Sequence, residues 1–353
     1  MKIAVLFDGA SALGKTPDLL ILATVEAVEA ALASEGNEVV RLPVNPDGRW
    51  MERVRKGKFD LAYNLCEGID GVAELEPSVI AILEMLHVPY TGSSSWTTAM
   101  CLRKHLVNAM LDRAGLPVPR WALVRRGDTL PVVGFPAIVK PAAEDASIGI
   151  EQRSVVRTVK ALNDRVNSML EIWDEVIVQR YVDGREVNVG IVGNDILPIA
   201  EIDFADMPKG MWRIVTYRSK WDEGTVDDLG AQPRCPADLS AEMAADLRRV
   251  ATAAWSAVGG EGYGRCDFRI DRNGRPWLLE VNANPDFSPD AGLARMARVA
   301  GTDYPALVRQ VAQVAIGRRP FSGTDGWAEA QMLSGMPRVA DPAALDLFAV
   351  GQQ

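Results

Sequence analysis

The sequence predicts an α/β fold, with a parallel sheet in the N-terminal part and an α+β arrangement in the C-terminal part. Near the N-terminus, strand-like segments alternate with helical ones, the pattern of a parallel sheet with helices on both faces. Further along, strand-like segments follow one another, which indicates an α+β unit. The expected strands are 2–7, 38–42, 59–64, 134–141, 175–181, 185–192 and 196–203, and the expected helices are 18–34, 76–86, 95–114, 154–170, 241–258 and 293–317.

Local patterns support each of these elements. Residues 2–7 are apolar, as in a buried strand. Residues 18–34 are rich in Ala and Leu, and Gly36 follows them as a helix stop. Residues 212–221, which include Lys220, are expected to form a loop. For helix 241–258, with Ser240 as N-cap, the expected inward residues are Met243, Leu247, Val250, Ala254 and Trp255.

Length and charge restrict the class of protein. A chain of 353 residues predicts two or three domains. The net charge of −9 argues against a general nucleic-acid-binding surface, whose affinity comes from neutralising phosphates. The four cysteines form no C-x-x-C pair, which favours reduced thiols. The apolar N-terminal run is too short for a signal peptide, and no apolar run could span a bilayer. We therefore expect a cytoplasmic protein that binds neither nucleic acid nor membrane.

Residues 9–16 match the G-x-x-x-x-G-K-[ST] phosphate loop and lie between a predicted strand and a predicted helix, as that motif requires. In this interpretation Lys15 would bind a nucleotide phosphate. Against it, Pro17 follows at once, and no later strand ends in an obvious partner acid. The other interpretation is a glycine-containing loop at the mouth of a sheet, which often lines a substrate site. The phosphate loop is the less favoured of the two.

Residues 264–285 are predicted to form a β-hairpin, because two alternating arms flank Asn273-Gly274, a strong signal for a two-residue turn. That turn sets the register of the two arms. The expected pairs are Arg272 with Arg275, Asp267 with Glu280, and Arg265 with Asn282. The expected core-facing residues are Cys266, Phe268, Ile270, Trp277, Leu279 and Val281.

This register places two carboxylates opposite each other, where like charges destabilise a strand pair. A cation between Asp267 and Glu280 would remove the repulsion, and with the amide of Asn282 they form an oxygen ligand set suited to Mg²⁺. Arg265 beside them could bind a phosphate or a developing oxyanion. A second interpretation is an ion-pair network in which Arg265 and Arg269 neutralise the acids. The hairpin alone leaves both open.

Several ordered blocks of residues, each weak alone, resemble the ATP-grasp superfamily and, within it, the D-alanine–D-alanine ligases. The resemblance covers residues 2–317. It implies an ATP-grasp fold with a Rossmann-like domain at 1–92, a central subdomain at 93–182, a C-terminal domain at 183–317 and a tail at 318–353. The blocks are 88–92 (VPYTG), Lys104, 115–119 (GLPVP), 135–141 (FPAIVKP), 179–186 (QRYVDGRE), Lys220, 264–267 (GRCD) and 278–285 (LLEVNANP).

The resemblance also implies ATP as a substrate, with Mg²⁺, or Mn²⁺ in its place, on Asp267, Glu280 and Asn282. Arg265 would stabilise the charge that develops as an acyl phosphate forms and collapses. The other residues implied to contact ATP are Lys104 and Lys140 at the phosphates, Lys220 near the γ-phosphate, Gln179, Arg180, Tyr181 and Val182 at the adenine, Glu186 at the ribose, and Ser147 in the mobile loop that covers the phosphates.

The implied reaction is the joining of a carboxylate to an amine, with release of ADP and phosphate. D-alanine ligases carry a Glu in the first glycine loop, a Ser in the phosphate-covering loop and a Tyr after the late lysine. Here the first loop has no Glu, and Ala146 and Trp221 replace the Ser and Tyr. Asn64-Leu65 and Ile69 also depart from the second loop of the family, and the Ser-Leu pair is missing near 290–293. We therefore predict a substrate other than D-alanine, because a site loses discrimination when its polar partners are removed.

Three further interpretations stay open beside this ligase: a true D-alanine–D-alanine ligase, the phosphate-loop protein that uses Lys15, and a non-catalytic relative that binds nucleotide. Intact Asp267, Glu280, Asn282 and Arg265 argue against the last of these. The acceptor could also be a thiol or a hydroxyl. The resemblance leaves a homodimer open, and no sequence feature demands one.

Overall fold

The computed structural model describes residues 1–10 and 21–318. Residues 1–317 form one structural unit, which is described here by itself. The phosphate-loop motif from residue 11 onward, the start of the helix expected at 18–34, and the tail from residue 319 lie outside the described residues. The domain boundaries at 92 and 182 stay predictions.

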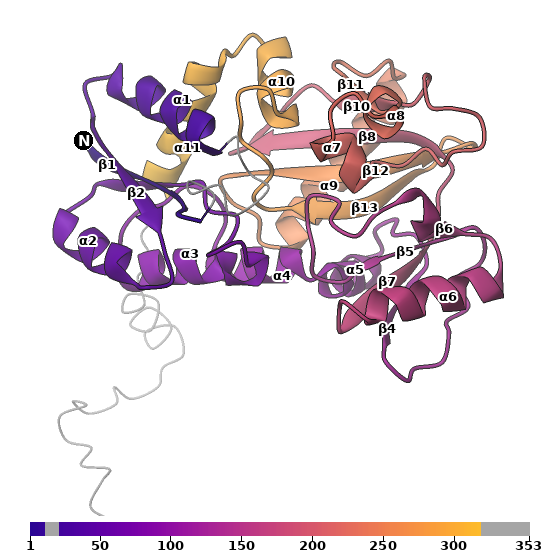
Figure 1. Cartoon of the computed structure of the whole chain (residues 1–353). Coiled ribbons are helices and arrows are strands. Elements are labelled where there is room, and N and C mark those ends of the chain that lie inside the picture. The colour runs from indigo at the N-terminus through magenta and orange to yellow at the C-terminus, as the bar shows by residue number, and fades with distance from the viewer. Residues whose placement is uncertain (11–20, 319–353) are drawn as a thin grey trace, which may run out of the picture. The chain divides into compact units, whose positions relative to one another are not determined.

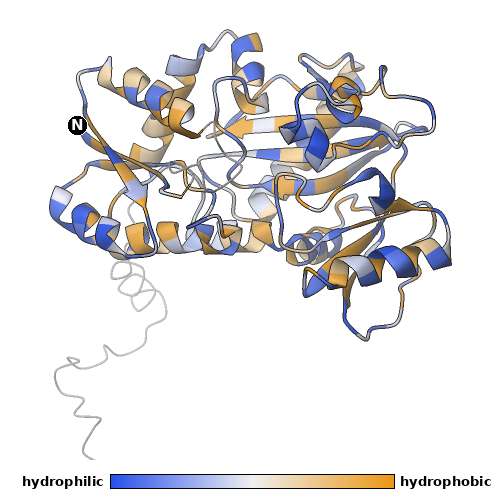
Figure 2. Cartoon of the chain, viewed as in Figure 1, coloured by the Kyte–Doolittle hydropathy of each residue, from blue (hydrophilic) through white to orange (hydrophobic). Residues whose placement is uncertain are grey.

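The first sheet is parallel, as the sequence predicts, and its three strands have the order β2-β1-β3. Its middle strand is apolar because both of its faces are covered: Ile3 and Val5 face one core, and Ala4 and Leu6 face the other. Figures 1 and 2 show this sheet between its helices. The strands are β1 (Lys2–Asp8), β2 (Glu38–Val44) and β3 (Leu61–Asn64).

Helices from both ends of the described chain cover this sheet. The first core joins α1 to α11, so a C-terminal helix completes the N-terminal sheet. The second core contains Trp50 and Val54 of α2 and Val79 and Leu83 of α3. These helices are α1 (Ile21–Ala33), α2 (Arg49–Gly57), α3 (Glu76–Met85) and α11 (Tyr304–Ile316).

The second sheet is antiparallel, with the order β4-β7-β5-β6. Helix α6 packs Val166 and Met169 against it. This helix begins at Val159, after the N-cap Thr158, and not at 154 as expected, because residues 152–156 form a short 3₁₀ turn and a strand. The elements are β4 (Trp121–Arg125), β5 (Ala137–Pro141), β6 (Val155–Val156), β7 (Glu175–Arg180) and α6 (Val159–Leu170).

The third sheet has six strands in the order β11-β10-β8-β12-β13, with β9 paired to β8. Helix α9 covers one face and buries Leu247, Val250, Ala254 and Trp255, as its periodicity predicts, while Met243 is half-buried. The elements are β8 (Gly184–Val192), β9 (Asp195–Ile196), β10 (Ala200–Asp203), β11 (Gln232–Arg234), β12 (Tyr263–Asp271), β13 (Pro276–Asn282) and α9 (Ala241–Ala257).

The hairpin of β12 and β13 has the predicted pairing of its acids but not the predicted turn. Asp267 lies opposite Glu280, and Arg265 lies opposite Asn282. The expected pairing of Arg272 with Arg275 is wrong, because the backbone N–H of Asp271 donates to the carbonyl of Arg275 at 3.0 Å and the turn is one residue longer. A β-bulge between Asp267 and Phe268 then shifts the register by one residue, so the two differences cancel at the acids.

Because of the bulge, the core-facing residues of β13 differ from the predicted ones. Leu278, and not Leu279, is fully buried in the core under α9. Leu279 lines the neighbouring cavity instead. Trp277 is half-buried, with the Arg275 guanidinium 4.1 Å from its ring centroid and its Nε1 donating to Asp271 at 2.9 Å. An extra residue in a strand moves the following side chains to opposite faces.

In three segments the helices differ from those predicted. The helix at 95–114 is broken at Arg103, where the backbone leaves helical geometry (φ −96°, ψ 84°). The segment at 293–317 is two helices, with Gly301 in the left-handed region between them (φ 87°). Part of the loop expected at 212–221 is a short helix. The elements are α4 (Ser95–Leu102), α5 (Lys104–Arg113), α7 (Tyr217–Trp221), α8 (Val226–Leu229) and α10 (Gly292–Val299).

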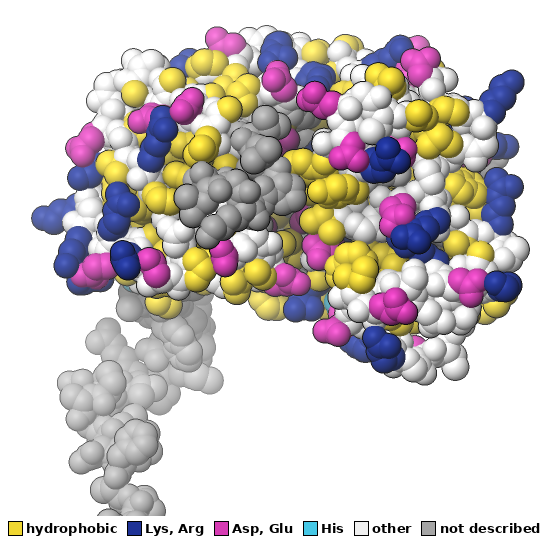
Figure 3. Space-filling model, viewed as in Figure 1, with side chains coloured by type: hydrophobic (Ala, Val, Ile, Leu, Met, Phe, Trp, Pro, Cys, Tyr) yellow, Lys and Arg dark blue, Asp and Glu magenta, His cyan; other side chains and the backbone are white. Residues whose placement is uncertain are grey.

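Two further features of this unit are the distribution of charged side chains on its surface and the length of its helices. In Figure 3, Lys and Arg side chains are interspersed with Asp and Glu on the face that is shown. No helix in residues 1–10 and 21–318 combines the length and the apolar character needed to cross a membrane.

Candidate active site

A cavity of about 640 Å³ is lined by residues from all three sheets. A second hollow, of about 650 Å³, lies beside α6 and contains none of the predicted site residues, so the first cavity is the candidate active site. The predicted residues that line it are Lys104, Lys140, Ser147, Gln179, Arg180, Tyr181, Val182, Glu186, Lys220, Arg265, Asp267, Glu280 and Asn282.

Asp267 is held by two side chains of its own sheet. Arg265 donates Nε and Nη2 to its two carboxylate oxygens at 2.7 and 2.9 Å. Asn188, on the adjacent strand β8, donates to Oδ1 at 2.7 Å. The ion-pair network proposed for the hairpin is therefore present in part, on Arg265. Arg269 instead pairs with Glu186 at 2.8 Å.

Glu280 and Asp145, which lies in the loop implied to cover the phosphates, both contact the ammonium group of Lys104. Lys104 Nζ lies 3.0 Å from Asp145 Oδ1 and 3.3 Å from Glu280 Oε1, and it also donates to the carbonyl of Glu144. Burial alone would lower the pKa of Lys104, but Asp145 and Glu280 outweigh it and raise the pKa. Burial raises the pKa of Asp145, whereas Lys104 and a hydrogen bond from Asp145 lower the pKa of Glu280 against the effect of its burial. The pKa of Asp145, raised to about 6, therefore lies above the lowered pKa of Glu280.

Two buried donors line the cavity from adjacent strands and have no partner among the described residues. Lys140 on β5 is 6% exposed, and none of the described residues forms a hydrogen bond or an ion pair with its ammonium group. Gln179 on β7 is 1% exposed, and its Nε2 has no acceptor within the described part of the chain. Buried polar groups rarely stay unpaired, so these two donors fit a ligand that is anionic and carries hydrogen-bond acceptors.

If Lys140 binds a phosphate of ATP, as the resemblance implies, its charge predicts a pH dependence of ATP affinity. Burial lowers the pKa of Lys140 to about 8. The group is cationic below that pH and neutral above it, so the affinity for ATP should fall as pH rises, by about tenfold between about pH 7 and 9. Titration calorimetry with Mg-ATP measures this, with Lys140→Arg as the control, since arginine keeps its charge. An equal fall in Lys140→Arg would assign the dependence to another group.

Other predicted residues line the same cavity. Burial raises the pKa of Glu186, and Arg269 partly opposes that shift. Tyr181 packs edge-on against Trp212, with ring centroids 5.1 Å apart. Lys220 lies on α7, where solvent reaches it through the cavity; desolvation by the surrounding protein lowers its pKa, and the charge of Arg265 adds to that effect.

The cavity extends to the carboxyl ends of the first sheet. Asp8 accepts hydrogen bonds from the backbone N–H groups of Ala10, Asp70 and Gly71, at 3.0, 3.1 and 2.8 Å, and so joins the loops that follow β1 and β3. The carboxylate of Asp8 therefore already accepts hydrogen bonds from three backbone N–H groups. Lining the cavity beside it is Glu76, whose pKa is raised by burial.

Sequence reasoning missed several polar residues of the site. Tyr263 donates to Asn284 Oδ1 at 2.7 Å, and Asn284 Nδ2 donates to Glu76 Oε1 at 3.0 Å. Asn188 follows Glu186 by two residues on β8, so strand alternation could have placed it on the same face. Asp145 carried no such signal, because only the folding of its loop brings it to Lys104.

Comparisons with known proteins define the class and then the family. The D-alanine–D-alanine ligase from Bacillus anthracis complexed with ATP superposes with a TM-score of 0.72 at 22% identity, covering 90% of this chain and 97% of that one. The family described as "D-ala D-ala ligase C-terminus" matches residues 110–313. The D-alanine–D-alanine ligase of Dechloromonas aromatica is 32% identical over 318 residues, which are 89% of this chain and 97% of the relative.

A further relative is the uncharacterized protein y4sG of Sinorhizobium fredii, 29% identical over 313 residues, which are 86% of this chain and 88% of that protein. The fold and these matches define an ATP-dependent carbon–nitrogen ligase of the ATP-grasp class. The chain belongs to the D-alanine–D-alanine ligase family. The resemblance predicted from the sequence is thereby confirmed.

Proposed function

We propose that the protein joins a carboxylate to an amine through an acyl phosphate, and that its substrate is not D-alanine. The carboxylate attacks the γ-phosphate of ATP, and ADP leaves. The amine then attacks the acyl carbon, the C–N bond forms, and phosphate leaves with the C–O electron pair. The observation that supports this most directly is that the cationic side chains and the carboxylates implied to hold Mg-ATP line one cavity, namely Lys104, Lys140, Lys220, Arg265, Asp267 and Glu280.

Each charged group has a proposed role. Asp267, Glu280 and Asn282 would hold Mg²⁺, which neutralises phosphate charge when bound. The hairpin register places Asp267 opposite Glu280 and Asn282 opposite Arg265, so the three proposed ligands lie on neighbouring positions of β12 and β13. Lys140 binds a phosphate with its unpaired ammonium group. Lys104 contacts a phosphate as well, and to do so it gives up one of its three partners, Glu144, Asp145 or Glu280.

The remaining residues position the reactants. Gln179 to Val182 contact the adenine, and Glu186 accepts from the ribose hydroxyls. Arg265 stabilises the charge of the acyl phosphate as it forms and collapses. Ser147 and its loop cover the phosphates and exclude water, which would otherwise hydrolyse the intermediate.

Residues at the amino-acid end of the cavity support a substrate other than D-alanine. In this chain the indole of Trp221 donates to the carbonyl of Ala146, at 3.4 Å. An alanine and a tryptophan that contact each other through a backbone carbonyl offer no side-chain acceptor for an ammonium group. A true D-alanine–D-alanine ligase is the second candidate, favoured by the named relatives.

Phosphate release from the full chain with Mg-ATP tests the substrate. With D-alanine as the only acceptor, the rate should stay near the background, at most about one hundredth of the rate with the best pair from a panel of carboxylates and amines. Strong release with D-alanine, lost in Glu280→Gln, would mean a true D-alanine ligase and would refute the argument from Ala146 and Trp221. A thioester or ester product in place of an amide would point to a thiol or hydroxyl acceptor.

Nucleotide binding by variants separates the ligase from the phosphate-loop protein and from a non-catalytic relative. The ligase predicts that Lys15→Ala leaves Mg-ATP turnover intact, whereas the phosphate-loop protein predicts that this substitution abolishes nucleotide affinity. A non-catalytic relative would bind Mg-ATP and release no phosphate with any acceptor. The homodimer and the cytoplasmic location stay predictions, which light scattering and cell fractionation test.

A further inference from the structure

The loop proposed to cover the phosphates joins β5 to the 3₁₀ turn Gln152–Ser154 and lines the cavity with Ala146, Ser147 and Ile148. Ala146 and Ser147 have positive φ angles of 52° and 61°, which side chains disfavour. Such a conformation persists only where the surroundings determine it. The contacts made along this loop and at its ends therefore decide where Ser147 lies; within it, Trp221 donates to the carbonyl of Ala146 and Lys104 contacts Asp145.

The downstream end of the loop is fixed at Gly149. A Cβ atom there would lie 2.8 Å from both the Pro141 ring and the Trp173 ring, and the φ of Gly149 is 75°. The chain thus passes through a gap that only glycine fits. Two residues further on, the side chain of Glu151 and that of Ser154 cap the 3₁₀ turn reciprocally.

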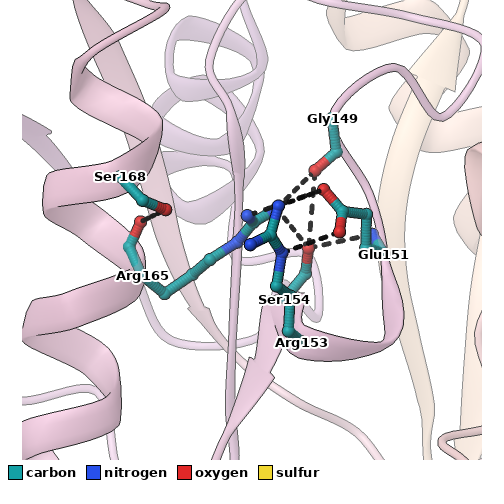
Figure 4. Close-up of polar contacts among 6 residues, drawn as sticks. All are labelled: Gly149, Glu151, Arg153, Ser154, Arg165 and Ser168. Carbon is teal, nitrogen blue, oxygen red and sulfur yellow. Dashed lines mark hydrogen bonds and ion pairs between the residues drawn. The ribbon is translucent and has the colours of Figure 1, made fainter.

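One side chain from outside the loop holds this end in place (Figure 4). Arg165 reaches across from α6 and donates Nη2 to the carbonyl of Gly149 at 2.7 Å and to Ser154 Oγ at 2.9 Å. Its side chain is 6% exposed, and Ser154 is fully buried. We call Arg165 with these two acceptors the Arg165 anchor. It couples α6 to the residue that ends the loop.

The charge of Arg165 is only partly compensated. Glu151 lies 3.7 Å away, and it is hydrogen-bonded to the exposed Arg153 instead, at 2.7 Å. None of the described residues accepts from the buried Nε of Arg165. Burying a cation without a full partner is costly, and such a cost persists where position matters more than stability.

We propose that Arg165 is a positioning residue that fixes the downstream hinge of the phosphate-covering loop, so that the loop closes with Ser147 over the nucleotide phosphates. This proposal rests on the proposed function, because it requires that the loop closes on nucleotide. Arg165 does not line the cavity and acts through the two residues that it holds, Gly149 and Ser154. Arginine is required, because its planar guanidinium directs Nη2 at both acceptors while Nη1 lies 3.7 Å from Glu151, whereas lysine offers a single ammonium group.

Hydrogen exchange of the loop amides, residues 142–150, tests the proposal in the full chain with and without the magnesium complex of the non-hydrolysable analogue AMP-PNP. In the unmodified chain the analogue should slow exchange of these amides. In Arg165→Lys that nucleotide-dependent protection should fall by about tenfold, while calorimetry gives a dissociation constant within about threefold, since the lysines of the cavity are untouched. Arg153→Gln is the matched control, because Arg153 also pairs with Glu151 but is 70% exposed and does not contact Gly149; it should retain full protection.

The outcomes separate this inference from the function on which it rests. If the unmodified chain binds no Mg-AMP-PNP, the proposed function fails and takes the inference with it. If the analogue binds and protects the loop equally in Arg165→Lys, the proposed function stands and the anchor is refuted. Should Arg165→Lys unfold, Ser154→Ala removes one acceptor of the anchor and should lose part of the protection; full protection in that variant would refute the anchor as well.

Discussion

Glu280→Gln is expected to lower Mg-ATP turnover by about a thousandfold or more, without unfolding the protein. Glu280 faces Asp267 in the hairpin, lies 3.3 Å from Lys104 and holds its charge because Lys104 and Asp145 outweigh the effect of burial on its pKa. The amide keeps the size of the side chain and removes the negative charge proposed to hold Mg²⁺. The measurement is phosphate release under saturating ATP, together with the magnesium concentration that gives half the maximal rate.

The matched control is Glu201→Gln. Glu201 also lies in the third sheet and pairs with an arginine, Arg185, which is 42% exposed and holds it through two hydrogen bonds of 2.6 Å. Turnover should stay within about twofold of the unmodified chain, because neither partner lines the cavity and such ion pairs contribute little. Full turnover in Glu280→Gln would mean that the site assignment is wrong.

Arg265→Lys is expected to lower kcat by about a hundredfold while changing the KM for ATP far less, since Arg265 is proposed to act on charge that develops during the reaction. A lysine keeps the charge but cannot hold both oxygens of Asp267 and face the acyl phosphate as well. Steady-state kinetics with the best substrate pair measures both constants.

Arg185→Lys provides the comparison for this variant. Both arginines grip a carboxylate of the third sheet through two hydrogen bonds, so both substitutions remove one fork. Of these two arginines, only Arg265 lines the cavity. A rise in KM with kcat unchanged in Arg265→Lys would show uniform binding of ground state and transition state, and would contradict the role given to Arg265.

The hairpin shows which features of the structure can be predicted from local sequence patterns. Asn273-Gly274 and the alternating arms were enough to place Asp267 opposite Glu280, although the turn is longer and a bulge restores the register. The bulge itself has no local signal, because it depends on packing: Leu278 is buried under α9 and donates its N–H to the carbonyl of Pro117, from a distant segment. The faces of Trp277 and Leu279 were therefore predicted wrongly.

By itself, the sequence determined the parallel first sheet, the inward face of α9, the pairing of the two acids and the resemblance to ATP-grasp ligases. These depend on periodicity, turn residues and the spacing of short blocks, all of which are local along the chain. Only the tertiary structure decided that α11 covers the first sheet, that Asp145 meets Lys104, and that Arg165 holds Gly149. Each of these contacts joins segments that lie apart in the sequence. It is stabilised by burial and charge interactions that arise only when the two segments pack together.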